Sequence, residues 1–128
     1  MHGEIQLDRP PVAGLLGLLM VLCGLALAHS TIVLQWHFTG GISVTDTLAS
    51  AGFGILGFAL VWAGLRRPEA QATLLGYIGG NLIWIGVFEW TWHYFGHWLE
   101  LEPVTYAGMP ILMPGLLMIQ STSLLVIA

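Results

Sequence analysis

The chain has 128 residues, of which 56% are hydrophobic and 8% are charged, and its formal net charge is -4. Soluble domains carry about 25% charged residues, so this composition excludes a water-soluble globular protein and predicts an integral membrane protein. Three basic residues are too few for the basic surface that a nucleic-acid partner requires. The lipid bilayer is therefore the first expected partner. The single cysteine excludes a disulfide framework.

The first half of the chain predicts two membrane helices. Residues 1–10 are polar and are expected at the membrane surface, and the apolar run over 11–38 predicts the first helix. After a glycine turn, Ser43-x-x-Asp46 has the spacing of a capping box, which predicts that the second helix covers 43–65. Glycines along this second helix predict close packing against a neighbouring helix.

The second half predicts two more helices, over 71–98 and 107–128. At 1.5 Å per residue the first of them is roughly 42 Å long, which exceeds a hydrocarbon core of about 30 Å and predicts tilting or protrusion. Pro110 and Pro114 fall in the first turns of the last helix, where proline is tolerated. The fold class predicted is an all-α integral membrane protein, with one four-helix, up-down domain over 1–128. Because the chain ends on apolar residues, we expect the natural protein to continue.

The arginines predict the orientation of this bundle. Arg9, Arg66 and Arg67 all fall on one side of a four-helix, up-down arrangement. Positively charged residues mark the cytoplasmic side of membrane proteins, so both termini are expected in the cytoplasm. The predicted location is the bacterial inner membrane, with the loops over 39–42 and 99–106 on the periplasmic side.

Ionisable side chains gather in the half of the membrane away from the arginines. Glu89, His93 and His97 follow one another at intervals of four residues, which keeps them near one face of a helix. His29 lies at a similar depth on the first helix. Carboxylate and imidazole groups on facing helices build metal sites in bundles, and this mixture favours copper or iron, with zinc or haem as further options. We therefore predict a metal site formed by these four residues.

The Glu89-x3-His93 spacing resembles, over five residues, the sites of the membrane copper monooxygenases of methane and ammonia oxidisers. Those sites also use a carboxylate, followed by a histidine four residues later, near the outer leaflet. The resemblance implies copper at Glu89 and His93. It is an analogy of spacing and assigns the chain to no family.

Three functions fit the Glu/His cluster. A carboxylate at membrane depth is a functional hypothesis by default, and the first interpretation is a small membrane subunit of a larger redox-type complex, with other membrane subunits as partners. The second is a structural or assembly subunit, in which the cluster joins helices through hydrogen bonds. The third is a protein of a proton or quinone pathway. Whether the chain is an enzyme is left open.

Other polar and aromatic residues receive structural interpretations. An interfacial aromatic belt at the outer membrane boundary is predicted to contain Trp36, His37, Trp90, Trp92 and Trp98. Asn81 and Gln120 both fall near the middle of the bilayer, so we predict a structural hydrogen bond between the third and fourth helices.

Overall fold

The computed structural model describes residues 10–119. Within this part of the chain, three helices are long and apolar enough to cross a membrane: α1, Pro10–Thr39; α2, Val44–Gly64; and a continuous helix over Glu69–Trp98. Their bounds agree closely with the first three predicted helices. The predicted helical fold is thereby confirmed, with three helices that could cross a membrane by length and composition.

The third of these helices changes its geometry part of the way along. It consists of α3, Glu69–Ile83, then a π-helical segment η1, Trp84–Glu89, and then α4, Trp90–Trp98. The amide of Trp90 donates to the carbonyl of Ile85, five residues earlier. Such π turns are rare and are often found at functional sites. This one ends at Glu89, the carboxylate of the predicted cluster.

The predicted fourth helix is wrong at its start. Instead of a helix from residue 107, the chain forms two antiparallel strands, β1, Val104–Tyr106, and β2, Met109–Leu112. Ala107 and Gly108 between them have φ angles of 51° and 78°, as a two-residue hairpin turn requires. Helical residues begin only at 114 and are described to 119. Because residues 120–128 lie outside the described part, a fourth membrane span stays a prediction.

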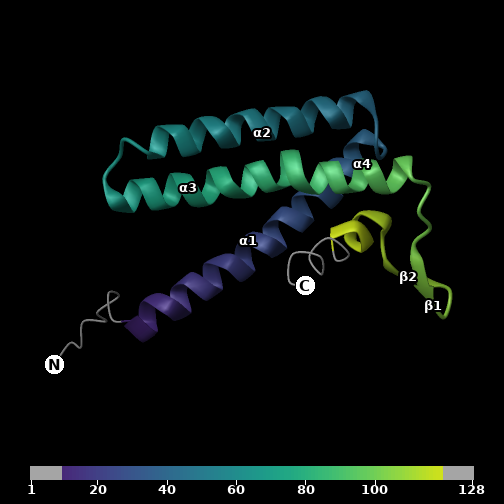
Figure 1. Ribbon diagram of the computed structural model, residues 1–128, viewed down its shortest axis with the longest axis horizontal. Helices are drawn as coiled ribbons and strands as arrows, with labels where there is room; N and C mark the ends of the chain where they lie inside the picture. The colour runs from purple at the N-terminus through teal and green to yellow at the C-terminus, as the bar shows by residue number, and fades with distance from the viewer. Residues whose placement is uncertain (1–9, 120–128) are drawn as a thin grey trace.

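The helices α2 and α3 form a close antiparallel pair (Figure 1). A Cβ atom added to Gly57 would lie 2.7 Å from the carbonyl oxygen of Gly79, so the two backbones are in direct contact there. The close packing predicted from the glycines of α2 is therefore confirmed. Gly80 is exposed and Gly76 is half-buried on α3, and an added Cβ at either position would meet nothing within 4 Å.

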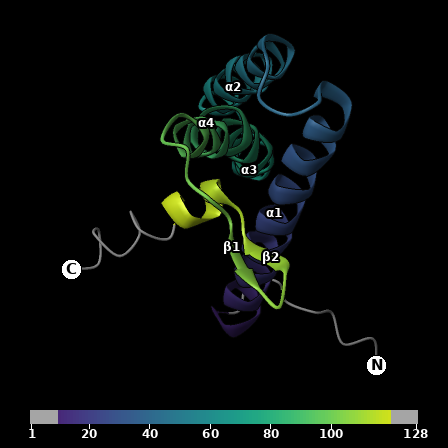
Figure 2. The ribbon, with the colours of Figure 1, turned by 90° about the vertical axis from the view of Figure 1, so that its right-hand side faces the viewer.

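The helix α1 crosses this pair at an angle and packs against it mainly through its C-terminal half (Figures 1 and 2). The buried hydrophobic core consists of Ala28 and Ile32 from α1 with Ile85 from η1. Large apolar side chains elsewhere on the helices are exposed, as expected for surfaces that face lipid. The packed part of the fold thus lies at the level of the polar cluster.

Candidate functional site

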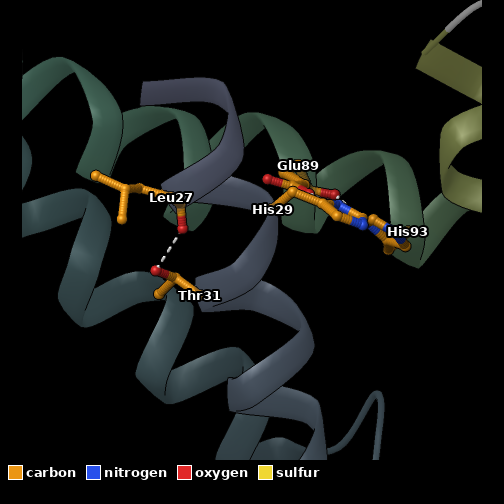
Figure 3. A network of polar contacts seen from close by, with 5 residues as sticks. All are labelled: Leu27, His29, Thr31, Glu89 and His93. Atoms are coloured by element: carbon orange, nitrogen blue, oxygen red, sulfur yellow. Dashed lines mark hydrogen bonds and ion pairs between the residues drawn. The ribbon is translucent and has the colours of Figure 1, made fainter. Parts of the chain in front are cut away.

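The centre of the candidate site is a hydrogen-bonded contact between η1 and α1. The side chain of Glu89 is 3% exposed, and its Oε1 atom lies 3.2 Å from Nδ1 of His29 (Figure 3). The His29 side chain is 51% exposed, so the imidazole can be reached from outside the bundle. The second carboxylate oxygen of Glu89, Oε2, is buried without a hydrogen-bond partner among the described residues. Two of the predicted residues, Glu89 and His29, which were placed at similar depth on different helices, are therefore in direct contact.

His93 lies next to Glu89 and is fixed from three sides. Its Nδ1–H donates to the main-chain carbonyl of Glu89 at 2.8 Å. The indole ring of Trp36 meets the imidazole edge to face, with ring centroids 4.3 Å apart. Gly115 packs closely against the third side of the ring. A Cβ atom added to Gly115 would lie 2.6 Å from Nε2 of His93. The bond at Nδ1 leaves Nε2 as the basic nitrogen of the neutral ring.

Replacing Gly115 with alanine is expected to move the His93 ring, because the added methyl group would overlap the imidazole. Overpacking of this kind costs about 1–3 kcal/mol. We expect a lower free energy of unfolding in detergent and a changed nitrogen NMR signal for His93. Gly80→Ala, where the space is open, is the control and should leave the His93 signal unchanged and the protein as stable as the wild type or slightly more stable. An unaltered His93 signal in Gly115→Ala would contradict the packing.

His97 does not join the other three predicted metal ligands. At about 100° per residue, a side chain eight positions after Glu89 is turned by roughly 80° from it. His97 is accordingly exposed, and Gly96 takes the buried position in that turn. Among the described residues, no group of three or more His, Cys, Asp or Glu side chains is arranged to hold a metal ion. The predicted four-residue metal set is therefore not assembled in this structure.

A second buried carboxylate, Asp46, was predicted only as the capping-box partner of Ser43. Ser43 is the N-cap of α2, since the Asp46 amide donates to the Ser43 hydroxyl at 3.2 Å. The Asp46 side chain is in addition fully buried. It accepts hydrogen bonds from Nε2 of Gln35 at 2.6 Å and from the Trp90 indole at 3.1 Å. Asp46 thus connects α1, α2 and α4.

A pattern in the sequence could have indicated this second network. Asp46, Ser50 and Gly57 are separated by four and seven residues, so they share one face of α2. Because the glycine marks the face that contacts α3, the two polar residues on the same face must also be buried. Gln35 then supplies the donor, with its Nε2 atom 2.8 Å from the Ser50 hydroxyl.

The two buried carboxylates differ in how completely they are hydrogen-bonded. Oδ1 of Asp46 accepts from Gln35 and Oδ2 accepts from Trp90. Glu89 has one oxygen paired with His29 and one buried without a described partner. A fully bonded carboxylate fixes a structure, whereas an unpartnered one can still bind something. Glu89 is therefore the better candidate for a functional group.

The residues predicted for the belt separate into two groups. Trp36 and Trp90 are half-buried and pack against the hydrophobic core. His37 and Trp98 are exposed and Trp92 is partly exposed, which agrees with a boundary position. Asn81 donates to the carbonyl of Tyr77 on its own helix at 2.9 Å. Gln120 lies outside the described residues, so the Asn81–Gln120 pair stays a prediction.

Two pockets adjoin the histidines that contact Glu89. The first, which we call the α1 pocket, has a volume of about 480 Å³ and is lined by His29, Ser30, Val33, Leu34 and His37. The second, which we call the end pocket, has a volume of about 580 Å³. It lies beside the C-terminal ends of α1 and α4. Its lining includes Trp36, His93, His97, Glu100 and Gly115. The volume of the end pocket is in the range of ligand sites, whereas the α1 pocket is an open hollow lined by α1 alone.

Comparison with protein-family models, with curated proteins and with solved structures finds no match for this chain.

Proposed function

We propose that this chain is a small integral membrane protein that binds a lipid-soluble, hydrogen-bonding ligand of the quinone type at Glu89 and His29. The observation that carries the proposal is the buried Oε2 atom of Glu89, which has no partner among the described residues. A buried polar atom without a partner costs about 1–3 kcal/mol. A ligand hydroxyl that donates to this oxygen would remove that penalty, and a quinol carries two such hydroxyl groups.

Access from the bilayer supports the same ligand class. His29 is half exposed on a helix that is apolar enough to span a membrane. Its Nδ1 atom is engaged by Glu89, which leaves Nε2 as the ring nitrogen for a ligand. Val33 and Leu34 line the same α1 pocket and provide apolar contacts for a ring. The proposed role of the Glu89–His29 pair is to hold the ligand oxygen and to exchange a proton with it.

A transition metal at this cluster has less support. A carboxylate bonded to one nitrogen of a histidine is the usual support of a metal ligand, and His29 with Glu89 has that form. However, the described residues provide no group of three ligands. A copper or iron site would need further ligands from other residues or another subunit.

We further propose that the protein works within a larger redox-type membrane assembly. Support comes from the uncovered glycines Gly76 and Gly80, four residues apart, since small residues at that spacing let membrane helices pack closely. Arg66 and Arg67 lie in the turn between α2 and α3, which favours the cytoplasm for that side. In a bacterial inner membrane, Glu89 would then lie in the periplasmic half.

Binding of decylubiquinol to the purified full chain tests the proposal. We expect saturable binding, measured by isothermal titration calorimetry in mild detergent. Glu89→Gln and His29→Ala should each raise the Kd at least tenfold, because His29 lines the α1 pocket and Glu89 holds its imidazole through Nδ1. Tenfold corresponds to about 1.4 kcal/mol.

His97→Ala is the matched control for the histidine variant. His97 is exposed and lines the end pocket instead of the α1 pocket, so its removal should leave the Kd within twofold of the wild-type value. The proposal is wrong if the wild type shows no saturable binding. It is also wrong if folded Glu89→Gln and His29→Ala bind as tightly as His97→Ala.

A further inference from the structure

The end pocket lies apart from the residues of the proposed ligand site. Its lining contains neither Glu89 nor His29, and its volume of about 580 Å³ is in the range of pockets that hold small molecules. It lies beside Thr39 and Trp98, the last residues of α1 and α4. Helices that span a bilayer end at its surface, so the end pocket lies at the level of the lipid head groups.

Two nitrogen atoms of the lining define the polar group that fits this pocket. Nε1 of Trp36 is buried and has no hydrogen-bond partner among the described residues, although buried indole N–H groups normally have one. Nδ1–H of His93 is bonded to the main-chain carbonyl of Glu89, which leaves Nε2 as an acceptor. The rings of Trp36 and His93 are in contact, with centroids 4.3 Å apart, and both line the pocket. A donor and an acceptor therefore lie close together in its wall.

The charge at the mouth of the end pocket determines the class of head group. Glu100 is exposed there, so its carboxylate repels phosphates and carboxylates, and the C-terminal ends of two helices add partial negative charge. An ammonium group has no acceptor for the indole N–H. An uncharged hydroxyl group satisfies both conditions, because its oxygen accepts from Trp36 and its hydrogen is donated to His93.

Apolar side chains in the lining complement a hydrocarbon chain. Ile42, Leu101 and Met113 line the same pocket, and Met113 is 44% exposed. We propose that the end pocket binds an uncharged lipid whose head group carries a free hydroxyl group, as in a monoacylglycerol. This site goes beyond the proposed function, because the end pocket and the α1 pocket share no lining residue and neither needs the other to be filled.

The NMR signal of the Trp36 indole tests this assignment directly. The full chain is purified in mild detergent with ¹⁵N-labelled tryptophan, and the Trp36 signal is identified by its absence from Trp36→Phe. Titration with 1-monooleoylglycerol should move the indole proton signal to lower field until it reaches a plateau, because the N–H gains an acceptor. The signal of Trp62, which is exposed on α2, is the control and should stay in place. A Trp36 signal that does not move overturns the proposal.

Three further probes separate the parts of the ligand. Octadecene has the chain without the hydroxyl group, glycerol has the hydroxyl groups without the chain, and 1-oleoyl-lysophosphatidate adds a negative charge. None of them should move the Trp36 signal at the concentration at which 1-monooleoylglycerol saturates. If glycerol alone moves it equally, the pocket binds a water-soluble polyol and the lipid is wrong. If the anionic lipid binds as tightly as 1-monooleoylglycerol, the uncharged head group is wrong.

Variants of the lining give a second, independent measurement by isothermal titration calorimetry with 1-monooleoylglycerol. Trp36→Phe keeps an aromatic ring and removes the N–H, so the Kd should rise about tenfold, as loss of one hydrogen bond predicts. Leu101→Trp fills the pocket and should also raise the Kd at least tenfold. Leu99→Trp is the matched control, because Leu99 is exposed on the same segment and does not line the pocket. Equal Kd values for folded Leu101→Trp and Leu99→Trp would overturn the proposal.

Discussion

Replacing Asp46 with alanine is expected to lower the free energy of unfolding by about 1–3 kcal/mol, the cost of one buried donor left without a partner. The substitution removes the acceptor of the Trp90 indole and one of the three acceptors of the Gln35 amide, which keeps the Asp46 main-chain oxygen and the Ser50 hydroxyl. Both donors come from helices other than α2, so the loss should also loosen α1 and α4. Unfolding of the purified protein by increasing mole fractions of SDS, followed by circular dichroism, measures this change.

Two further variants separate the network from the helix cap. Asp46→Asn keeps an oxygen for Gln35 but turns an amide donor towards the Trp90 indole, so most of the loss is expected. Thr47→Ala removes a hydroxyl that bonds only to Ser43 within the same helix start and should change stability by less than about 0.5 kcal/mol. Equal stabilities for Asp46→Ala and Thr47→Ala would show that the interhelical bonds contribute nothing.

The three long helices could be predicted because composition and segment length determine them. An apolar run long enough to cross the hydrocarbon core must satisfy its backbone internally, and a helix does so. The first three helices therefore matched their predicted ranges. The hairpin over 104–112 was missed because its residues are apolar as well. Its signal was local, namely β-branched and aromatic residues before Ala107-Gly108, where a turn with positive φ angles forms.

The candidate site could be predicted only as far as helix geometry is regular. Equal depth on two helices correctly paired His29 with Glu89. The prediction that His97 shares a helix face with Glu89 was wrong, because a side chain eight residues further along is turned by roughly 80° around the helix axis. The π turn of η1 could not be read from the sequence, since it changes the register by hydrogen bonds that no residue type specifies. The bonds from Asp46 to Gln35 and Trp90 were not predicted, because the capping-box spacing already accounted for an aspartate at this position.

The two networks have different roles. The Asp46 network is structural, and the Glu89–His29 pair is the proposed ligand site. Asp46, with Gln35 and Trp90, holds α1 and α4 to the start of α2. Trp90 directly follows Glu89 in the chain, so the bond from Trp90 to Asp46 fixes the end of the π turn that carries the Glu89 carboxylate. The expected consequence is that loss of Asp46 also impairs ligand binding at Glu89, although Asp46 lines neither the α1 pocket nor the end pocket.

Replacing Gly86 with alanine is expected to lower the free energy of unfolding by about 3 kcal/mol, at the upper end of the usual range for overpacking. An added Cβ at this position would lie 2.5 Å from the Gly54 amide nitrogen and would also overlap the Ser50 carbonyl oxygen. These are backbone atoms of α2, so no side chain can rotate away. The helices must separate, and η1, which contains Glu89, must move with them.

Gly76→Ala is the matched control, because Gly76 lies on the same continuous helix and its added Cβ would meet nothing within 4 Å. Alanine favours a helix over glycine by up to about 1 kcal/mol, so this variant should be as stable as the wild type or slightly more stable. Both variants are compared by the SDS unfolding used for Asp46. If Gly86→Ala is no less stable than Gly76→Ala, the close approach of η1 to α2 is wrong, and with it the position assigned to Glu89 beside His29.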